Sequence, residues 1–400
     1  MHRMDVEERR RRLAVRHGLG PHRVGEPAGL PADPAQVARQ LVALHATDPA
    51  TVYLSVLARM AGPVTPGAIE ESLYERRDLI RMLAMRRTVF VLPAESVAVV
   101  QASTTDRVGK DQRARLLKHL RAGTTVAEPE SWLADVERSV LRLLAQRGGT
   151  ATATELSAAE PRLKTTLVMA AGKPYQATQT VTSRVLLVLA AQGRIVRGRP
   201  VGSWLSQQYR WVLAEHWLRA EADTISEAAA RTELARQWLV AFGPAPLTDL
   251  KWWTGWTMAQ VRQAAEALGV VEVELGGAGV GAALPGDIGG TEDPGDWAAL
   301  LPALDATVMG WQERSWFLGP HARSLFDTNG NAGPTIWLNG QVVGGWAQRA
   351  DGEIAIRLLQ DTGAEGKALI EAESGRVGTW LAGVRVIPRF RTPTERDLSA

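Results

Sequence analysis

Residues 227–275 read EAAARTELARQWLVAFGPAPLTDLKWWTGWTMAQVRQAAEALGVVEVEL, and this stretch decides the fold. A helical run ends at Gly243-Pro244, two shorter helical runs follow, and the stretch closes with the alternating run VVEVEL. Helix, turn, helix and then a strand-like wing is the plan of a winged-helix motif. In that plan the second helix of the turn pair can enter the DNA major groove, where base edges are readable.

The same order of elements recurs twice upstream. In the first copy a helical run leads to the break Gly62-Pro63, and a Thr65 cap followed by Pro66 starts the next helix. The second copy starts near Trp132 and ends with the helical run TSRVLLVLAAQG and the strand-like run RIVRGRP. We therefore predict an α+β protein with a helical lead-in over 1–33 and three tandem winged-helix motifs over 34–130, 131–225 and 226–275.

The character of the chain changes after Leu275. Gly and Pro crowd residues 276–295, as is typical of a loop or linker, and short alternating runs follow. Asn339-Gly340 lies between two such runs and suits a type I′ hairpin turn, and a helix is expected near 363–373. We predict that 276–400 form a linker and a C-terminal β-barrel-like domain. Its polar hairpin either reaches a DNA minor groove or simply covers the winged helices.

The composition excludes several classes of protein. The chain of 400 residues has no cysteine, which excludes disulfides, thiolate zinc sites and cysteine nucleophiles. Its apolar runs are shorter than the roughly 18 residues of a membrane span, and its first residues lack the apolar core of a signal peptide. We therefore expect a cytoplasmic, nucleoid-associated protein. The histidines lack metal-ligand spacing and no Walker A or Rossmann loop is present, so we expect neither a metal nor a cofactor.

Residues 45–49, His-Ala-Thr-Asp-Pro, are the strongest candidate for chemistry. They follow an apolar helical run, at the point where Asp48-Pro49 interrupts it. His45 can take up a proton near neutral pH, and Thr47 can hold a water molecule. An alternative is purely structural, with His45 at the carboxyl end of a helix and Thr47 capping the next helix.

Several other polar residues could contact DNA or support the site. Arginine clusters give a chain of net charge +3 local positive patches, which suit either phosphate contacts or a solvated surface. Asp305 could orient a catalytic partner or cap a turn, and Trp252–Trp253 with Trp256 have the spacing of core residues. The candidate DNA contacts are Arg86, Arg87, Ser203, Gln207, Arg210 and Asn339.

Six stretches, in order along the chain, resemble a known family. They are LVALHATDPATVYLSVLARM, LIRMLAMRRTVFVLPAE, RPVGSWLSQQYRW, GPAPLTDLKWWTG, LLPALDATVMGWQERS and WLNGQVVGGW. The chain resembles, from about residue 8 to residue 390, the winged-helix DNA-binding-domain family that includes the AlkZ and YcaQ DNA glycosylases. The resemblance implies three winged-helix motifs and a β-barrel around a basic, C-shaped DNA channel.

The resemblance also implies an activity and a pair of site residues. Characterised members excise N7-alkylated purines, and one unhooks interstrand crosslinks made by a genotoxic antibiotic. Their catalytic motif is Gln-x-Gln or Gln-x-Asp after the first helix, and the matching positions here are His45 and Thr47. The resemblance thus implies a monofunctional glycosylase for repair or self-resistance, with a neutral His45.

Other functions remain open at this point. One alternative is a catalytically inactive DNA-binding protein that acts as a regulator or sequesters lesions, and another is a winged-helix protein that binds a protein or small molecule. The expected partner is double-stranded DNA that carries a lesion. We expect a monomer. Sequence-specific regulators usually dimerise on palindromes, so a monomer in solution would favour the glycosylase over a regulator.

Overall fold

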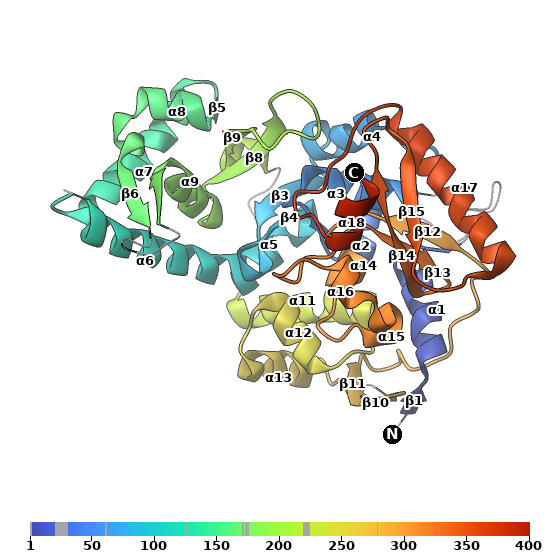
Figure 1. Ribbon diagram of the computed structural model, residues 1–400. Coiled ribbons are helices and arrows are strands. Elements are labelled where there is room, and N and C mark those ends of the chain that lie inside the picture. Colours follow the sequence, from blue (N-terminus) through green and yellow to red (C-terminus); the bar gives the residue numbers. More distant parts are fainter. Residues whose placement is uncertain are drawn as a thin grey trace.

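The protein is a mixed α+β molecule in which helices and several small sheets alternate (Figure 1). This confirms the α+β part of the predicted fold class. The computed structural model describes residues 2–20, 31–60, 62–124, 126–169, 172, 176–218, 225–277 and 279–400.

The three helices of the first unit begin with the same signal. Asp33, Asp48 and Thr65 each accept a hydrogen bond from the first turn, and a proline follows each of them. Strands of this unit pair in the order β2-β4-β3. The elements are α2 (Pro34–Gln40), β2 (Leu44–His45), α3 (Pro49–Leu57), α4 (Pro66–Glu70) with a π-helical turn (Glu71–Glu75), β3 (Leu79–Leu83) and β4 (Val89–Pro93).

The second unit stands to one side of the molecule, and the long helix α6 (Asp106–Gly123) leads to it (Figure 1). Its strand order, β5-β9-β8, repeats that of the first unit. The inserted hairpin of β6 (Thr166–Met169) and β7 (Ala177–Thr180) separates its second and third helices. The repeating elements are α7 (Pro129–Gln146), β5 (Thr150–Thr152), α8 (Ala153–Ala159), α9 (Thr182–Ala191), β8 (Ile195–Pro200) and β9 (Tyr209–Leu213).

The third unit follows the same plan, with a bridge between Ala245 and Ala282 in place of its first strand. The N-terminal strand β1 (His2–Met4) pairs in parallel with β10. Its hairpin runs on to Ala283, so the Gly-rich segment after Leu275 forms a turn and a strand where a linker was predicted. The elements are α11 (Glu227–Phe242), α12 (Leu247–Thr254), α13 (Met258–Ala267), β10 (Val271–Leu275) and β11 (Gly279–Ala283).

The C-terminal region contains an open sheet, and the described residues form no closed barrel. Its strands pair in sequential order and leave β12 and β15 as edges. Helices cover this sheet: α17 (Gly363–Leu381) packs on β12 and β15, and α18 (Pro393–Leu398) packs on β14. The sheet is therefore completed by helices rather than by closure on itself. The strands are β12 (Ala298–Leu301), β13 (Thr335–Leu338), β14 (Gln341–Gln348) and β15 (Ile354–Leu358).

The predicted hairpin between β13 and β14 is confirmed. Asn339 and Gly340 have φ angles of 47° and 82°, which a type I′ turn requires. The helix predicted near 363–373 is also present and extends to Leu381. Shorter helices complete the chain: α1 (Val6–Arg16), α5 (Val97–Val100), α10 (Ala214–Trp217), α14 (Ala306–Met309), α15 (Ser315–Leu318) and α16 (Ala322–Leu325).

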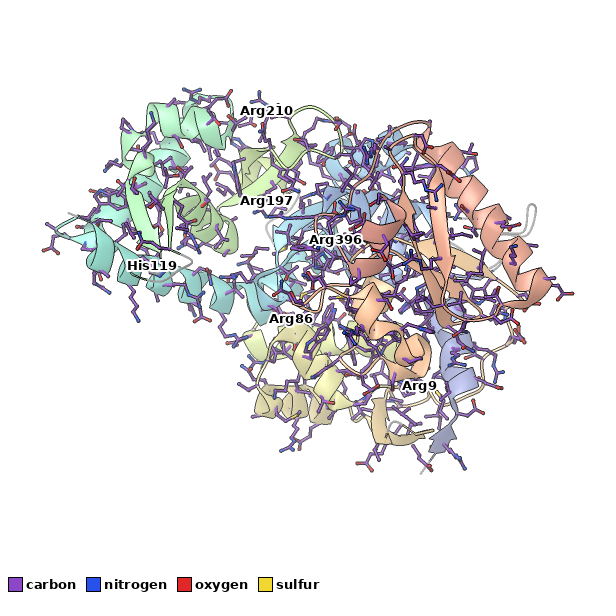
Figure 2. All side chains as sticks on the ribbon, in the orientation of Figure 1. Arg9, Arg86, His119, Arg197, Arg210 and Arg396 are labelled. Atoms are coloured by element: carbon purple, nitrogen blue, oxygen red, sulfur yellow. The ribbon has the colours of Figure 1, made fainter. Side chains whose placement is uncertain are left out.

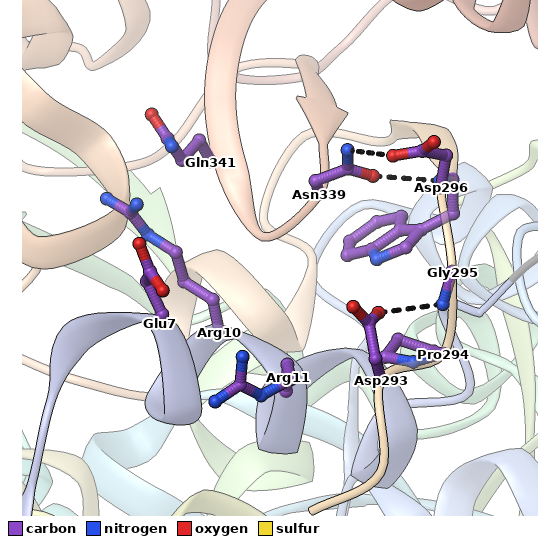
Figure 3. Close-up of a pocket in the computed structure, with 10 residues that line it drawn as sticks. Glu7, Arg10, Arg11, Asp293, Pro294, Gly295, Asp296, Asn339 and Gln341 are labelled. Atoms are coloured by element: carbon purple, nitrogen blue, oxygen red, sulfur yellow. Dashed lines mark hydrogen bonds between the residues drawn. The ribbon is translucent and has the colours of Figure 1, made fainter.

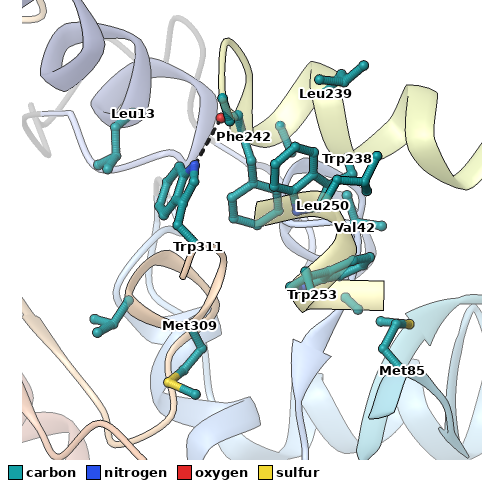
Figure 4. Packing of buried hydrophobic residues seen from close by; sticks show 14 of the residues in the cluster. Leu13, Val42, Met85, Trp238, Leu239, Phe242, Leu250, Trp253, Met309 and Trp311 are labelled. Carbon is teal, nitrogen blue, oxygen red and sulfur yellow. Dashed lines mark hydrogen bonds between the residues drawn. The ribbon is translucent and has the colours of Figure 1, made fainter. Parts of the chain in front are cut away.

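One tryptophan-rich core joins the first unit, the third unit and the C-terminal region (Figure 4). Trp238, Phe242, Trp253 and Trp311 meet at its centre, and the Trp311 Nε1 donates a hydrogen bond of 3.2 Å to the carbonyl of Phe242. The second unit has a separate core of aliphatic side chains from α6, α7, α8 and α9. A third cluster joins the first unit, the C-terminal sheet and the β8–β9 part of the second unit.

Candidate functional site

His45 lies on a strand, and this overturns its placement at the end of the first helix. α2 stops at Gln40, Val42 adopts a positive φ of 62°, and the chain then turns into β2. His45 pairs with Phe90 across the β2–β4 ladder. The structural alternative of a histidine at a helix carboxyl end is therefore wrong.

The imidazole of His45 is buried and neutral. It is 7% exposed and meets the ring of Phe90 edge-on, with centroids 5.2 Å apart. Burial, followed by the positive charge of Arg86, lowers the pKa of His45 to about 3. Its Nδ1 atom is buried and makes no hydrogen bond within the described structure. A neutral imidazole keeps one acceptor nitrogen, but Nδ1 is closed to solvent in this structure, so water reaches it only after the site opens.

Thr47 sits at the rim of the site, half-buried, and it does not cap α3. Asp48 does so, because its Oδ1 accepts a hydrogen bond of 3.2 Å from the amide of Ala50. The second oxygen of Asp48 accepts a bond of 2.9 Å from the amide of Arg389. Burial raises the pKa of Asp48, although these amide bonds and the Arg389 charge oppose the shift.

Arg389 connects the second unit to the rim of the site through hydrogen bonds to both. Its Nη1 donates to the Gln207 Oε1 at 3.0 Å and to the Thr47 carbonyl at 3.4 Å. Gln207 belongs to the loop between β8 and β9, and Trp204 anchors that loop between Tyr53 and Trp380, at ring distances of 4.7 and 5.9 Å. The structure thus brings Gln207 to Thr47.

The other predicted residues of this loop region stay on the surface. Ser203 and Arg210 are exposed, and the Arg210 guanidinium lies 3.7 Å from the Glu155 carboxylate. Figure 2 shows Arg210 on the second unit and Arg86 apart from it, near the start of α6.

Arg86 and Arg87 form the turn between β3 and β4, close to His45. Their φ angles are 52° and 64°, and the Thr88 amide donates to the Met85 carbonyl at 2.9 Å. The guanidinium carbon of Arg86 lies 3.9 Å from the centre of the Trp252 ring. Figure 2 shows Arg86 near the place where α6 leaves the body of the molecule.

Asn339 is taken up by contacts within the protein. Its Nδ2 donates to Asp296 at 2.6 Å, and its Oδ1 accepts from the Trp297 amide at 2.8 Å (Figure 3). The hairpin tip lines a polar cleft of about 340 Å³ against α1, on which Arg10 and Arg11 also lie. His45 is not part of this cleft.

Asp305 makes an ion pair in the interior instead of contacting His45. Its carboxylate accepts bonds of 2.7 and 3.0 Å from Arg59, 2.6 Å from Ser55 and 2.9 Å from the Thr307 amide. Burial alone would raise the pKa of Asp305, but Arg59 and these hydrogen bonds lower it below its usual range. The pair ties α3 to the start of α14.

Sequence reasoning missed three residues near the site: Phe90, Arg314 and Arg389. Arg389 belongs to one of the arginine clusters, over residues 385–391, but its contact with Thr47 joins segments far apart in the chain. Trp252, expected in the core, is only half-buried and lies beside two guanidinium groups.

Metal-ligand clusters and membrane-spanning helices are both absent from the described residues. No group of three or more His, Asp or Glu side chains there is arranged to hold a metal ion. In the same part of the chain, none of the helices has the length and apolar character needed to cross a membrane.

The comparisons with known proteins identify the class as DNA glycosylases. A family model described as "DNA glycosylase AlkZ-like" matches residues 38–380, and the chain therefore belongs to the AlkZ-like DNA glycosylase family. Membership of this family makes DNA its partner. The fold is similar to that of Streptomyces sahachiroi DNA glycosylase AlkZ, with a TM-score of 0.72 and 19% identity over 96% of this chain and 98% of that one. No curated protein matches the chain.

Proposed function

We propose that the protein is a monofunctional DNA glycosylase that hydrolyses the N-glycosidic bond of bulky N7-alkylated purines in duplex DNA. The observation that carries this proposal is the neutral His45, which has an unpartnered Nδ1 and lies beside Thr47 and the arginine turn. These two residues occupy the positions of the family's glutamine motif. Unhooking of crosslinks, for repair or for self-resistance to a genotoxin, is the natural extension of this activity.

Hydrolysis of this glycosidic bond requires few catalytic groups from the protein. An N7-alkylated purine is cationic, so its glycosidic bond is already weakened and the leaving base needs no added proton. A ring whose pKa is about 3 holds a proton poorly at neutral pH. His45 therefore acts as an acceptor that orients the attacking water, and the Thr47 hydroxyl fixes the same water. A neutral ring also avoids repelling the positive charge that develops on the sugar.

Three repeated units support the proposed mode of DNA binding. Each has the order helix, strand or bridge, helix, helix and a two-stranded hairpin, and in each the first strand or bridge pairs with the last strand. We assign them as winged-helix motifs, which bind duplex DNA through the third helix or the hairpin. Ser203, Gln207, Arg210, Arg86 and Arg87 are the proposed contacts. We propose that the protein works as a monomer in the cytoplasm, on the nucleoid.

The test is base release from duplex DNA that carries N7-alkylguanine, read as strand cleavage by alkali at the abasic site. Wild type should release the base, and His45→Ala/Thr47→Ala should release it about a hundredfold more slowly while still binding DNA. His321→Ala/Thr328→Ala is a matched control on the far C-terminal segment and should behave as wild type.

A second candidate is a catalytically inactive DNA-binding protein. The burial of His45 to 7% exposure favours it, because little of the ring reaches solvent. If wild type binds the modified duplexes but releases no base from several different adducts, the enzyme proposal is wrong and this alternative holds.

A further inference from the structure

Two hairpins of this protein have two consecutive residues with positive φ at the tip, and these residues differ greatly in kind. The β13–β14 turn has Asn339 and Gly340 at its centre, which tolerate positive φ, whereas the β3–β4 turn has Arg86 and Arg87 there. Arginine carries a Cβ atom that opposes the left-handed conformation. Strained residues of this kind persist where their side chains serve a function. The strain at Arg86 and Arg87 therefore indicates that their side chains bind a ligand.

Arg86 points its charge toward other cationic groups. Its guanidinium stacks on Trp252, and the Arg314 guanidinium lies 4.9 Å from the centre of the same ring. Burial is the main cause that lowers the pKa values of His45 and Arg314, and the positive charge of Arg86 lowers them as well. Asp249 acts on Arg314, but no carboxylate within the described structure pairs with Arg86.

The charge of Arg87 acts on a second group of cations, which belongs to α6 and α9. Burial, followed by the charges of Arg87 and Arg115, lowers the pKa of Arg184 on α9. Burial, followed by Arg184, Arg115 and Lys118, lowers that of His119 on α6. Arg87, Arg115, Lys118 and Arg184 make no ion pair with any described residue. These cations thus repel one another without a compensating carboxylate.

Other arginines of the protein do have acidic partners. Arg199, for example, contacts both Glu70 and Glu75 at 2.9 and 2.7 Å. An unpaired, partly desolvated group of guanidinium ions is a site for an anion of the phosphate type, because arginine binds phosphate oxygens in pairs. The turn lies at the site, and its two arginines have different neighbours, since Arg86 stacks on Trp252 and the charge of Arg87 acts on Arg184.

We propose that Arg86 and Arg87 bind two phosphates of one DNA strand, at the hairpin tip and beside the nucleotide presented to His45. This placement relative to the reacting nucleotide rests on the proposed glycosylase function. Trp252 holds the Arg86 side chain in position, and a phosphate between Arg86 and Arg314 removes their mutual repulsion. The DNA thus supplies the negative charge that the protein lacks here.

The test replaces the strained turn with the preferred one, as Arg86→Asn/Arg87→Gly. We expect this variant to fold at least as stably as wild type, because Asn-Gly suits the turn. Its affinity for an undamaged duplex should fall about tenfold, and the slope of log K against log salt should shrink by about 1.8, since each phosphate contact contributes about 0.9.

Two controls make the result specific. Arg138→Gln/Arg349→Gln removes the same charge from exposed positions elsewhere and should leave the slope unchanged. Arg86→Lys/Arg87→Lys keeps the charge and should keep most of the slope while it loses affinity. An unchanged slope in the Asn-Gly variant, or an equal loss in the distant control, would overturn the proposal.

The position of the contacts is tested separately, with neutral methylphosphonates placed one at a time around an N7-alkylguanine. A methylphosphonate at either of two phosphates next to the lesion should weaken the binding of wild type. The same substitution should not weaken the binding of Arg86→Asn/Arg87→Gly, which has already lost these contacts. Failure of base release would leave the salt slope on undamaged DNA unaffected, so the phosphate contacts and the glycosylase function can fail independently. Sensitivity spread evenly along the duplex would contradict the placement beside the lesion.

Discussion

The ring of His45 lies edge-on to that of Phe90, with an interplanar angle of 63°, on two strands whose pairing places the residues directly opposite each other. The β2–β4 ladder therefore fixes the orientation of the imidazole, and the neighbouring Arg86 disfavours its protonation. The proposed catalytic group is held by the sheet rather than by a flexible loop. Measurable consequences follow for stability, activity and loop order.

The first concerns the pH dependence of stability. Burial is the largest cause that lowers the pKa values of His17 and His45 to about 3, from an ordinary value of 6.5. Between these values the unfolded chain binds more protons than the native one, so stability falls as the pH falls below 6.5. Each histidine should cost about 2 kcal/mol at pH 5 relative to pH 8. Urea unfolding across this range measures the loss, and His45→Gln should remove about half of it.

The second concerns the replacement of His45 by the residue of the family motif. His45→Gln keeps a hydrogen-bond acceptor for the attacking water and should retain base release within about tenfold. His45→Leu fills the same space without an acceptor and should lose about a hundredfold. Single-turnover rates on N7-alkylguanine duplexes give the comparison. Equal rates for the two variants would exclude a water-orienting role.

The third concerns the ion pair of Arg59 and Asp305, in which both side chains are fully buried. Asp305→Leu or Arg59→Met alone should destabilise the fold by about 3–5 kcal/mol, because each leaves a buried partner uncompensated. Arg59→Met/Asp305→Leu should cost clearly less than the sum of the two single changes. Urea unfolding of all four proteins completes the cycle, and strict additivity would show that the pair is not coupled.

The fourth concerns the loop between β8 and β9. Trp204→Ala removes the side chain that packs between Tyr53 and Trp380, so the loop should leave the rim of the site. Trypsin should then cut after Arg210, at the end of this loop, several times faster, and DNA affinity should fall as Gln207 moves away. Trp132→Ala, in the second unit, is the matched control and should leave that bond protected.

Sequence patterns predicted the local features of this fold well. Thr65 followed by Pro66 marked a helix start, and Asn339-Gly340 marked a hairpin, because each signal depends on the backbone of a few adjacent residues. The turn at Arg86 and Arg87 gave no such signal, since arginine is not typical of positive φ. His45 was assigned to a helix because its apolar neighbours continue a helical period, which the positive φ of Val42 interrupts.

The site itself depends on contacts that no local pattern carries. Arg389 reaches Thr47 across 342 positions in the sequence, and Arg314 meets Arg86 over the ring of Trp252. The barrel was expected from alternating strands alone, whereas α17 and α18 cover the sheet and leave its edges apart. Such packing between distant segments decides which polar residues become neighbours.

The second unit has a hydrophobic core of its own, separate from the tryptophan-rich core under His45. A change inside that unit, such as loss of the β6–β7 hairpin, leaves the packing around the histidine untouched. Over evolutionary time the two parts can therefore diverge at different rates. A lineage can remodel one arm of the molecule to suit new DNA substrates while it inherits its reaction chemistry intact.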